Sequence, residues 1–220
     1  MPRPDKRNII YLYVASAQPV TAVALAALDD EERAQAERLP QQEAQIYVRA
    51  HLLLREMLRD LAGIERPAFR KTSYGKPYIE GSDLCFNISH TKGKVAVALS
   101  FGREVGVDIE EINPHRADEV MARQMFTPDE FDLWQNASNQ SEAFFRIWTL
   151  KESIMKATGL GSVLPLRSFN VTLASPQFVH SPDRANWFCE TGLIDQRHAW
   201  ALSVRTRDED EQAFIEKQIF

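Results

Sequence analysis

The order of helical and strand-like segments constrains the fold of this chain more than any other feature, because a similar order occurs in both halves. Each half has helical segments and roughly three strand-like segments, although no residue-level repeat is visible. This arrangement is typical of an α+β fold in which helices pack on small, mostly antiparallel sheets. We therefore predict two similar subdomains that face each other, over residues 1–104 and 105–220.

The expected elements of the first half begin with a strand. The sequence predicts strands over 8–15, 84–88 and 95–100, an extended segment over 69–79, and helices over 21–38 and 43–61. Pro40 ends or bends the first helix, and Gly63 provides a stop for the second. The segment His90-Thr91-Lys92-Gly93-Lys94 has turn-like residues, so the two strands beside it are expected to form a hairpin.

The second half is expected to open with a strand in which apolar and acidic residues alternate. The sequence predicts strands over 105–111, 169–173, 187–191 and 198–205, and helices over 117–125 and 142–158. Thr127 and Glu130 have the spacing of a capping box, which marks the start of a further helix. The charged stretch 208–220 has no clear prediction.

Composition narrows the class of protein. The chain has 220 residues, of which 44% are hydrophobic, so it can bury a sizeable core. Its formal net charge is −5, which gives no global positive field to attract a nucleic acid. Cys85 and Cys189 lie far apart, without the spacing of a zinc site or a disulfide framework.

The N-terminus has two interpretations. Arg3, Lys6 and Arg7 precede an apolar run over 9–17, a pattern that imitates a weak secretion signal. The run is short and contains two tyrosines, so a first β-strand explains it better. Because no stretch approaches the roughly 20 apolar residues of a membrane-spanning helix, we expect a cytoplasmic protein without a membrane partner.

The helix over 142–158 carries charges where apolar side chains are expected. A projection at about 100° per residue gives a broad apolar arc, formed by Phe144, Phe145, Ile147, Trp148, Ile154 and Met155. Lys151 and Glu152 fall within that arc. A buried charge without a partner is costly, so each needs a counter-ion, a metal ion or a cleft. The alternative is that they pair with neighbours or extend to solvent.

Asp108 and Glu110 lie two residues apart on a predicted strand and therefore point to the same face. A cation between them would relieve their repulsion, and carboxylate oxygens suit Mg²⁺, which also binds phosphate oxygens. The alternative is a solvated edge strand. Lys156 follows Glu152 by four residues, a spacing that taken alone indicates a surface ion pair.

Two further segments have the chemistry of phosphate binding. Gly75-Lys76-Pro77 places a cation in a constrained turn, although an ordinary surface turn has the same pattern. Ser89 and His90 end a predicted strand. Neighbours on a strand point to opposite faces, which argues against a Ser-His nucleophile pair and favours phosphate binding.

Four motifs in one order carry a resemblance to a known family. They are YGKPY at 74–78, FNISH at 86–90, VGVDIE at 105–110 and WTLKESIMK at 148–156. Together they resemble the Sfp-type 4'-phosphopantetheinyl transferases, and the resemblance covers the chain densely from about residue 69 to residue 169. It implies two subdomains related by a pseudo-twofold axis, with coenzyme A and Mg²⁺ in the cleft between them.

The resemblance also implies roles for individual residues. The metal ligands would be Asp108, Glu110 and Glu152, and the lysines near the pyrophosphate would be Lys151 and Lys156. Contacts to the phosphates of coenzyme A would come from Lys76, Ser89 and His90. Either Arg49 or His51 would bind the 3'-phosphate, because the family pattern can be aligned with this segment in two ways that differ by two residues.

The implied reaction transfers the 4'-phosphopantetheine group of coenzyme A to a serine of an acyl or peptidyl carrier protein and releases 3',5'-ADP. Glu152 would act as metal ligand, base or both, while Lys156 or Lys151 stabilises the departing nucleotide. We expect a monomer, because one chain holds both halves of the cleft. The alternatives are a magnesium-dependent phosphate-ester hydrolase and a non-catalytic coenzyme A-binding module.

Overall fold

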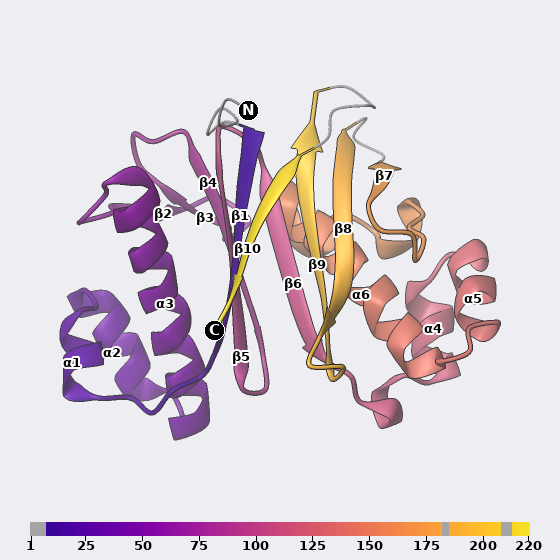
Figure 1. Ribbon diagram of the computed structural model, residues 1–220, viewed down its shortest axis with the longest axis horizontal. Helices are drawn as coiled ribbons and strands as arrows, with labels where there is room; N and C mark the ends of the chain where they lie inside the picture. Colours follow the sequence, from indigo (N-terminus) through magenta and orange to yellow (C-terminus); the bar gives the residue numbers. More distant parts are fainter. Residues whose placement is uncertain (1–7, 182–184, 208–212) are drawn as a thin grey trace.

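The computed structural model describes residues 8–181, 185–207 and 213–220. It contains two four-stranded sheets and a separate two-stranded ribbon. Helices α1 to α3 lie outside the first sheet and helices α4 to α6 outside the second, as Figure 1 shows. The order of layers is therefore helix, sheet, sheet, helix, which confirms the predicted α+β class.

The first sheet has the strand order β10-β1-β5-β4. Its strands are β1 (Ile9–Ser16), β4 (Leu84–Thr91), β5 (Lys94–Phe101) and β10 (Phe214–Ile219). The pairs β1–β5 and β4–β5 are antiparallel, whereas β10 runs parallel to β1. The separate ribbon consists of β2 (Phe69–Lys71) and β3 (Pro77–Ile79).

The second sheet is antiparallel throughout, with the order β6-β9-β8-β7. Its strands are β6 (Val105–Glu111), β7 (Gln177–His180), β8 (Asn186–Ile194) and β9 (His198–Thr206). The α-helices are α1 (Ala22–Ala26), α2 (Asp30–Arg38), α3 (Gln41–Ala62), α4 (Glu119–Met125), α5 (Pro128–Gln135) and α6 (Gln140–Thr158). Short 3₁₀ turns cover Pro114–Arg116, Gly161–Val163 and Leu166–Ser168.

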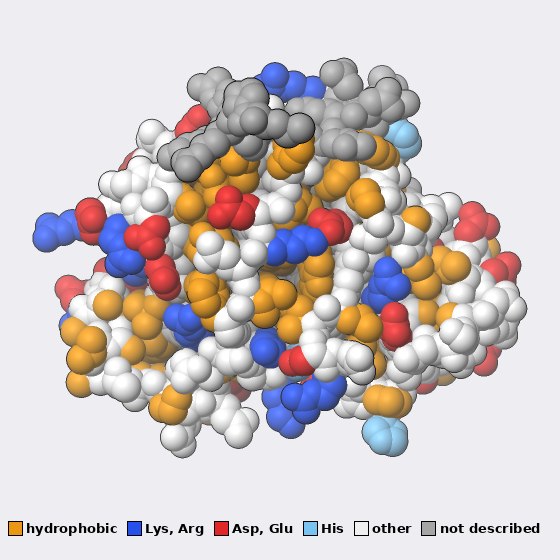
Figure 2. All heavy atoms as spheres, viewed as in Figure 1, with side chains coloured by type: hydrophobic (Ala, Val, Ile, Leu, Met, Phe, Trp, Pro, Cys, Tyr) orange, Lys and Arg blue, Asp and Glu red, His pale blue; other side chains and the backbone are white. Residues whose placement is uncertain are grey.

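The alternation of side chains along each strand divides the core into layers. The side chains between the two sheets include Ile10, Leu12, Val14, Ala96, Ala98, Val105, Val107, Ile109, Leu202 and Val204. The opposite face of the first sheet packs on α3, and α6 packs on the second sheet. The two halves thus share one apolar layer. On the face shown in Figure 2, acidic and basic side chains are interspersed with apolar ones.

The predicted helix over 21–38 is divided in the structure, so that prediction is wrong. Asp29 caps a new helix: its Oδ1 accepts the amide of Glu32 at 2.8 Å, while Glu32 Oε2 accepts the amide of Asp29 at 3.1 Å. This reciprocal capping satisfies two amides that a continuous helix would pair internally, and so favours a break.

Two differences concern strands. Residues 169–173 form no strand, and β7 is instead the outer strand of the second sheet. Within the stretch 208–220, residues 214–219 form β10, whereas 208–212 lie outside the described residues. Because β10 pairs with β1, the last strand of the chain lies in the first sheet, on the other side of the boundary expected between residues 104 and 105.

Candidate active site

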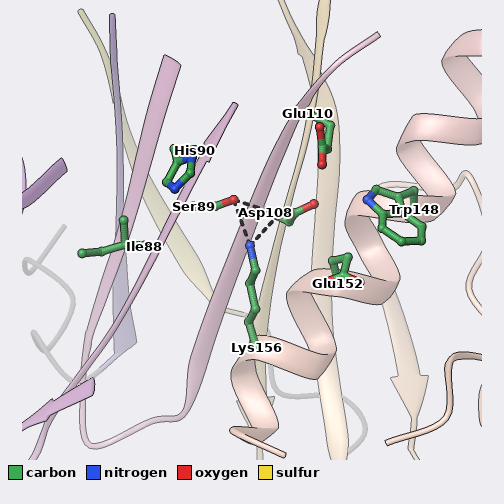
Figure 3. A pocket seen from close by; sticks show the side chains of 8 residues that line it. All are labelled: Ile88, Ser89, His90, Asp108, Glu110, Trp148, Glu152 and Lys156. Carbon is green, nitrogen blue, oxygen red and sulfur yellow. Dashed lines mark hydrogen bonds and ion pairs between the residues drawn. The ribbon is translucent and has the colours of Figure 1, made fainter. Parts of the chain in front are cut away.

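A cavity of about 240 Å³ opens where strand β4 of the first sheet meets strand β6 of the second sheet and helix α6. Its lining residues, drawn in Figure 3, are Ile88, Ser89, His90, Asp108, Glu110, Trp148, Glu152 and Lys156. All three carboxylates predicted from the sequence are among them. So are Lys156, Ser89 and His90, which means that one pocket collects six of the predicted site residues from both halves.

The close approach of α6 to β6 makes this gathering possible. Asp108 and Glu110 share the face of β6 that is turned to α6, the face that also carries Gly106. A Cβ at Gly106 would lie 2.0 Å from the carbonyl oxygen of Ser153 and 2.5 Å from the amide of Ala157. Only glycine lets the helix come this near.

Asp108 is the most buried of the carboxylates, with 4% of its surface exposed. Its Oδ1 accepts hydrogen bonds from Ser89 Oγ at 2.8 Å and from Lys156 Nζ at 2.6 Å. Its Oδ2 is buried and has no hydrogen-bond partner. A buried carboxylate oxygen without a partner is costly, and a cation in the pocket would satisfy it.

The pocket raises the pKa values of the other two carboxyl groups. Burial raises the pKa of Glu152, and the negative charge of Asp108 adds to the effect. The same two causes raise the pKa of Glu110, although Arg116 lies 3.6 Å from its Oε2 and opposes them. Added positive charge would therefore favour the ionised form of the whole group.

The carboxylates do not form a preformed cage. Within residues 8–181, 185–207 and 213–220, no three His, Cys, Asp or Glu side chains converge closely enough to hold a metal ion. This arrangement still fits Mg²⁺, which is usually held by one or two carboxylates, waters and the phosphates of a substrate. The buried, unpartnered Oδ2 of Asp108 is the observation that supports the fit.

Lys151 lies outside the pocket, contrary to its predicted place near the pyrophosphate. Its side chain is completely buried, and its Nζ donates to Glu130 Oε1 at 2.6 Å and to the carbonyl oxygen of Phe169 at 2.8 Å. The expectation that a core-facing lysine needs a partner is confirmed. Its assignment as a catalytic residue is corrected, because the ammonium group is enclosed by α5 and by the segment after α6.

Lys76 also lies outside the pocket. From the β2–β3 turn, its Nζ donates to the carbonyl oxygens of Ala157 at 2.6 Å and Val105 at 3.2 Å. Burial lowers its pKa. The contact with a phosphate of coenzyme A stays a prediction. In the structure the two carbonyl groups, one of them near the C-terminus of α6, hold the ammonium group outside the lining of the cavity.

Arg49 and His51 lie on α3, and neither lines the cavity. His51 Nδ1 is 2.8 Å from Glu32 Oε1, and its ring lies 4.1 Å from that of Tyr47. The Nε of Arg49 is buried and has no hydrogen-bond partner. His51 is thus paired through Nδ1, whereas Nε of Arg49 has no acceptor.

Sequence reasoning missed Trp148 as a pocket residue. It was assigned to the apolar arc of the helix, yet it lines the cavity with Glu152. The available signal was its position four residues before Glu152, which places both on one helix face. Arg116 was also missed, because its approach to Glu110 depends on the 3₁₀ turn that follows β6.

Comparison with known proteins places the chain in a family. The family model of the 4'-phosphopantetheinyl transferase superfamily matches residues 104–205. The 4'-phosphopantetheinyl transferase gsp of Aneurinibacillus migulanus is 40% identical over 122 residues, which are 54% of this chain and 50% of that protein. The 4'-phosphopantetheinyl transferase psf-1 of Bacillus pumilus is 33% identical over 162 residues, 70% of this chain and 68% of that protein.

The chain belongs to the 4'-phosphopantetheinyl transferase superfamily. The resemblance seen in its four motifs is thereby confirmed. The chain spans about half the length of several of the relatives that it matches. Among solved structures, the holo-[acyl-carrier-protein] synthase of Thermotoga maritima matches 48% of this chain and 64% of its own, with 24% identity and a TM-score of 0.39. Within the described residues, no helix is long and apolar enough to cross a bilayer.

Proposed function

We propose that this protein transfers the 4'-phosphopantetheine group of coenzyme A to a serine of an acyl or peptidyl carrier protein and releases 3',5'-ADP. The observation that carries the proposal is the pocket itself, which unites Asp108, Glu110 and Glu152 with Lys156. Three carboxylates and a lysine suit a reaction at a pyrophosphate, where a cation and an ammonium group must offset negative charge.

Asp108, Glu110 and Glu152 would hold Mg²⁺, and the unpartnered Oδ2 of Asp108 supports this assignment. When bound, Mg²⁺ would neutralise the pyrophosphate and draw electron density from the β-phosphorus. Strand β6 and helix α6 hold these carboxylates in fixed orientations.

The other pocket residues would move the proton and stabilise the leaving group. The serine oxygen of the carrier forms a bond to the β-phosphorus as the bond to the bridging oxygen of 3',5'-ADP breaks. Glu152 lines the pocket beside Asp108 and would take the serine proton. Lys156 would stabilise the charge that develops on the departing ADP.

The adenosine end of coenzyme A would be bound by His90 and Arg49. His90 lines the pocket, where partial desolvation of its ring and the charge of Lys156 lower its pKa. Arg49 is assigned to the 3'-phosphate in preference to His51, because His51 is already paired with Glu32.

The partner would be a small acidic carrier domain that docks on a local basic and apolar surface, although the chain as a whole carries a net charge of −5. Arg116, which lies beside Glu110 and is more than half exposed, is suited to this contact. We also propose that the protein acts as a monomer in the cytoplasm, without a nucleic-acid or membrane partner.

The test is intact-mass spectrometry of apo carrier proteins incubated with this protein, coenzyme A and Mg²⁺, with an EDTA control. The expected result is a mass gain of one phosphopantetheine arm that is lost with EDTA. Hydrolysis of coenzyme A without any gain on several carrier classes would indicate a hydrolase. Binding of coenzyme A without reaction would indicate a binding module, and either result would contradict the proposal.

A further inference from the structure

Two edge strands meet beside the pocket without forming a backbone ladder. β4 is the last strand of the first sheet, and β6 is the last strand of the second. An edge strand leaves every second backbone amide without a partner, and such amides are costly when buried. The junction between the two halves therefore needs another source of acceptors.

Side chains of β4 supply these acceptors. Asn87 Oδ1 accepts the amide of Val107 at 2.9 Å. Two residues on, Ser89 Oγ accepts the amide of Ile109 at 3.3 Å. After two more, Thr91 Oγ1 accepts the amide of Glu111 at 3.0 Å. The three acceptors are every second residue of β4, and the three amides belong to every second residue of β6. The two strands are thus joined by a ladder in which side chains of β4 accept from the backbone of β6.

The two hydroxyl groups of this ladder also reach the carboxylates of the pocket. Ser89 donates to Asp108 Oδ1 at 2.8 Å, and Thr91 donates to Glu110 Oε2 at 3.4 Å. In each case the hydroxyl accepts the amide of one β6 residue and donates to the carboxylate of the residue before it. The same unit thus occurs twice along the strand.

Ser89 has no remaining capacity for a ligand. A hydroxyl group donates once and accepts twice. Ser89 donates to Asp108 and accepts from the amide of Ile109 and from Lys156 Nζ, the latter at 2.9 Å. Figure 3 shows Ser89, Asp108 and Lys156 joined in this way. A phosphate of coenzyme A would have to displace one of these partners.

We propose that Ser89 and Thr91 are positioning residues, which hold Asp108 and Glu110 by one carboxylate oxygen each. The other oxygen is thereby left for the cation, as the unpartnered Oδ2 of Asp108 illustrates. The inference rests on the proposed function, because only there do these carboxylates bind Mg²⁺. It replaces the expectation that Ser89 contacts a coenzyme A phosphate. Loss of such an outer partner typically weakens metal binding by about 10- to 100-fold.

The decisive variant is Thr91→Val, which removes the hydroxyl group and preserves the shape of the side chain. Titration calorimetry with MgCl₂, in the presence of saturating coenzyme A, is expected to show Mg²⁺ binding weakened by about 10-fold or more. Thr91→Ser keeps the hydroxyl group and is expected to bind like the wild type. Transfer by Thr91→Val should recover at high Mg²⁺, because the chemistry of the pocket is unchanged.

Ser89→Ala separates positioning from ligand binding. Coenzyme A is titrated into this variant in EDTA, where no metal contributes. The inference predicts unchanged affinity for coenzyme A in EDTA and weakened Mg²⁺ binding. Loss of coenzyme A affinity in EDTA, with Mg²⁺ binding retained, would show that Ser89 contacts the nucleotide and would overturn the inference for this residue.

Thr206→Val is the matched control. Thr206 lies at the end of β9, outside the lining of the pocket, and its Oγ1 is buried without a hydrogen-bond partner. It is expected to bind Mg²⁺ like the wild type. If the wild type neither binds Mg²⁺ nor transfers the arm, the proposed function fails. If the wild type does both and Thr91→Val equals it, the positioning role fails alone. Should Thr91→Val not fold, Ser89→Ala decides.

Discussion

Lys151 is paired in the hydrophobic core with the carboxylate of Glu130, which opposes the lowering of its pKa by burial. Glu130 is itself completely buried and serves three partners. Its Oε1 accepts from Lys151 and from the amide of Val171, and its Oε2 accepts the amide of Thr127 at 2.8 Å. One side chain thus joins the start of α5, the middle of α6 and the segment before β7.

Removing this carboxylate charge tests the structural role of the pair. Glu130→Gln leaves Lys151 buried without a counter-ion, and we expect the free energy of unfolding to fall by about 3–5 kcal/mol. The double variant Glu130→Gln with Lys151→Met should regain part of the loss, because no uncompensated charge remains. Urea unfolding measures both.

Activity provides the complementary readout for Lys151. The double variant, assayed where it is folded, should still transfer the phosphopantetheine arm, since Lys151 lies outside the pocket. A folded double variant without transfer activity would restore the catalytic role that the sequence suggested.

At the scale of elements, the pocket depends on the packing of α6 against β6. The atoms that a Cβ at Gly106 would meet belong to the backbone of α6, in the same turns that carry Glu152 and Lys156. A backbone cannot yield as a flexible side chain does, so the whole helix would have to shift.

Gly106→Ala is therefore expected to destabilise the protein by about 3 kcal/mol or more and to reduce transfer in the molecules that remain folded. Thermal unfolding and the transfer assay measure the two effects. Gly192→Ala is a suitable control, because a Cβ at Gly192 would meet a side chain and not a helix backbone: its nearest atom would belong to the Trp200 side chain, at 3.1 Å. Equal losses from the two variants would contradict a special role for the β6–α6 contact.

The elements that the sequence predicted correctly have strong periodicity. The strand 105–111 matches β6 residue for residue, and the helices over 43–61 and 142–158 agree with α3 and α6 to within two residues at each end. The capping box of Thr127 and Glu130 is also confirmed. In these segments the local pattern and the burial agree.

The prediction failed where distant side chains take the backbone partners. Residues 169–173 have the composition of a strand, but the carbonyl of Phe169 accepts from Lys151 and the amide of Val171 donates to Glu130. The amide of Val171 cannot also donate to a neighbouring strand. β10 was not predicted, since its partner β1 lies at the other end of the chain.

In the pocket, too, residues placed by a local pattern were predicted better than residues placed by distant contacts. The shared face of Asp108 and Glu110 followed from their spacing on a strand. Glu152 was joined to them by the family resemblance, and the structure places all three in one pocket. Lys76 and Lys151 were misplaced, because the head of a lysine lies several bonds from the backbone and its place depends on acceptors that the sequence order does not reveal.

At the scale of the whole molecule, Lys76 joins the two halves. It extends from the ribbon of the first half to the carbonyl groups of Val105 on β6 and Ala157 on α6. Those carbonyl oxygens would otherwise lack a donor at the junction.

Lys76→Met is expected to lower the free energy of unfolding by about 1–3 kcal/mol, because two carbonyl groups lose their donor. Coenzyme A affinity, measured by calorimetry at a temperature where the variant is folded, should remain near that of the wild type. A variant of full stability that binds coenzyme A weakly would instead support the phosphate contact predicted from the sequence.

The parallel pairing of β10 with β1 bears on how the protein is made. β1 is synthesised before β10, and residues 17–213 separate the two strands along the chain. During that interval one edge of β1 has no partner, and an open edge invites pairing with other nascent chains. Glu216 and Lys217 of the finished strand are both exposed and, as neighbours on a strand, point to opposite faces of the sheet. Charges on an edge strand discourage further pairing. Pairing with β10 covers the edge of β1 that stays open until then.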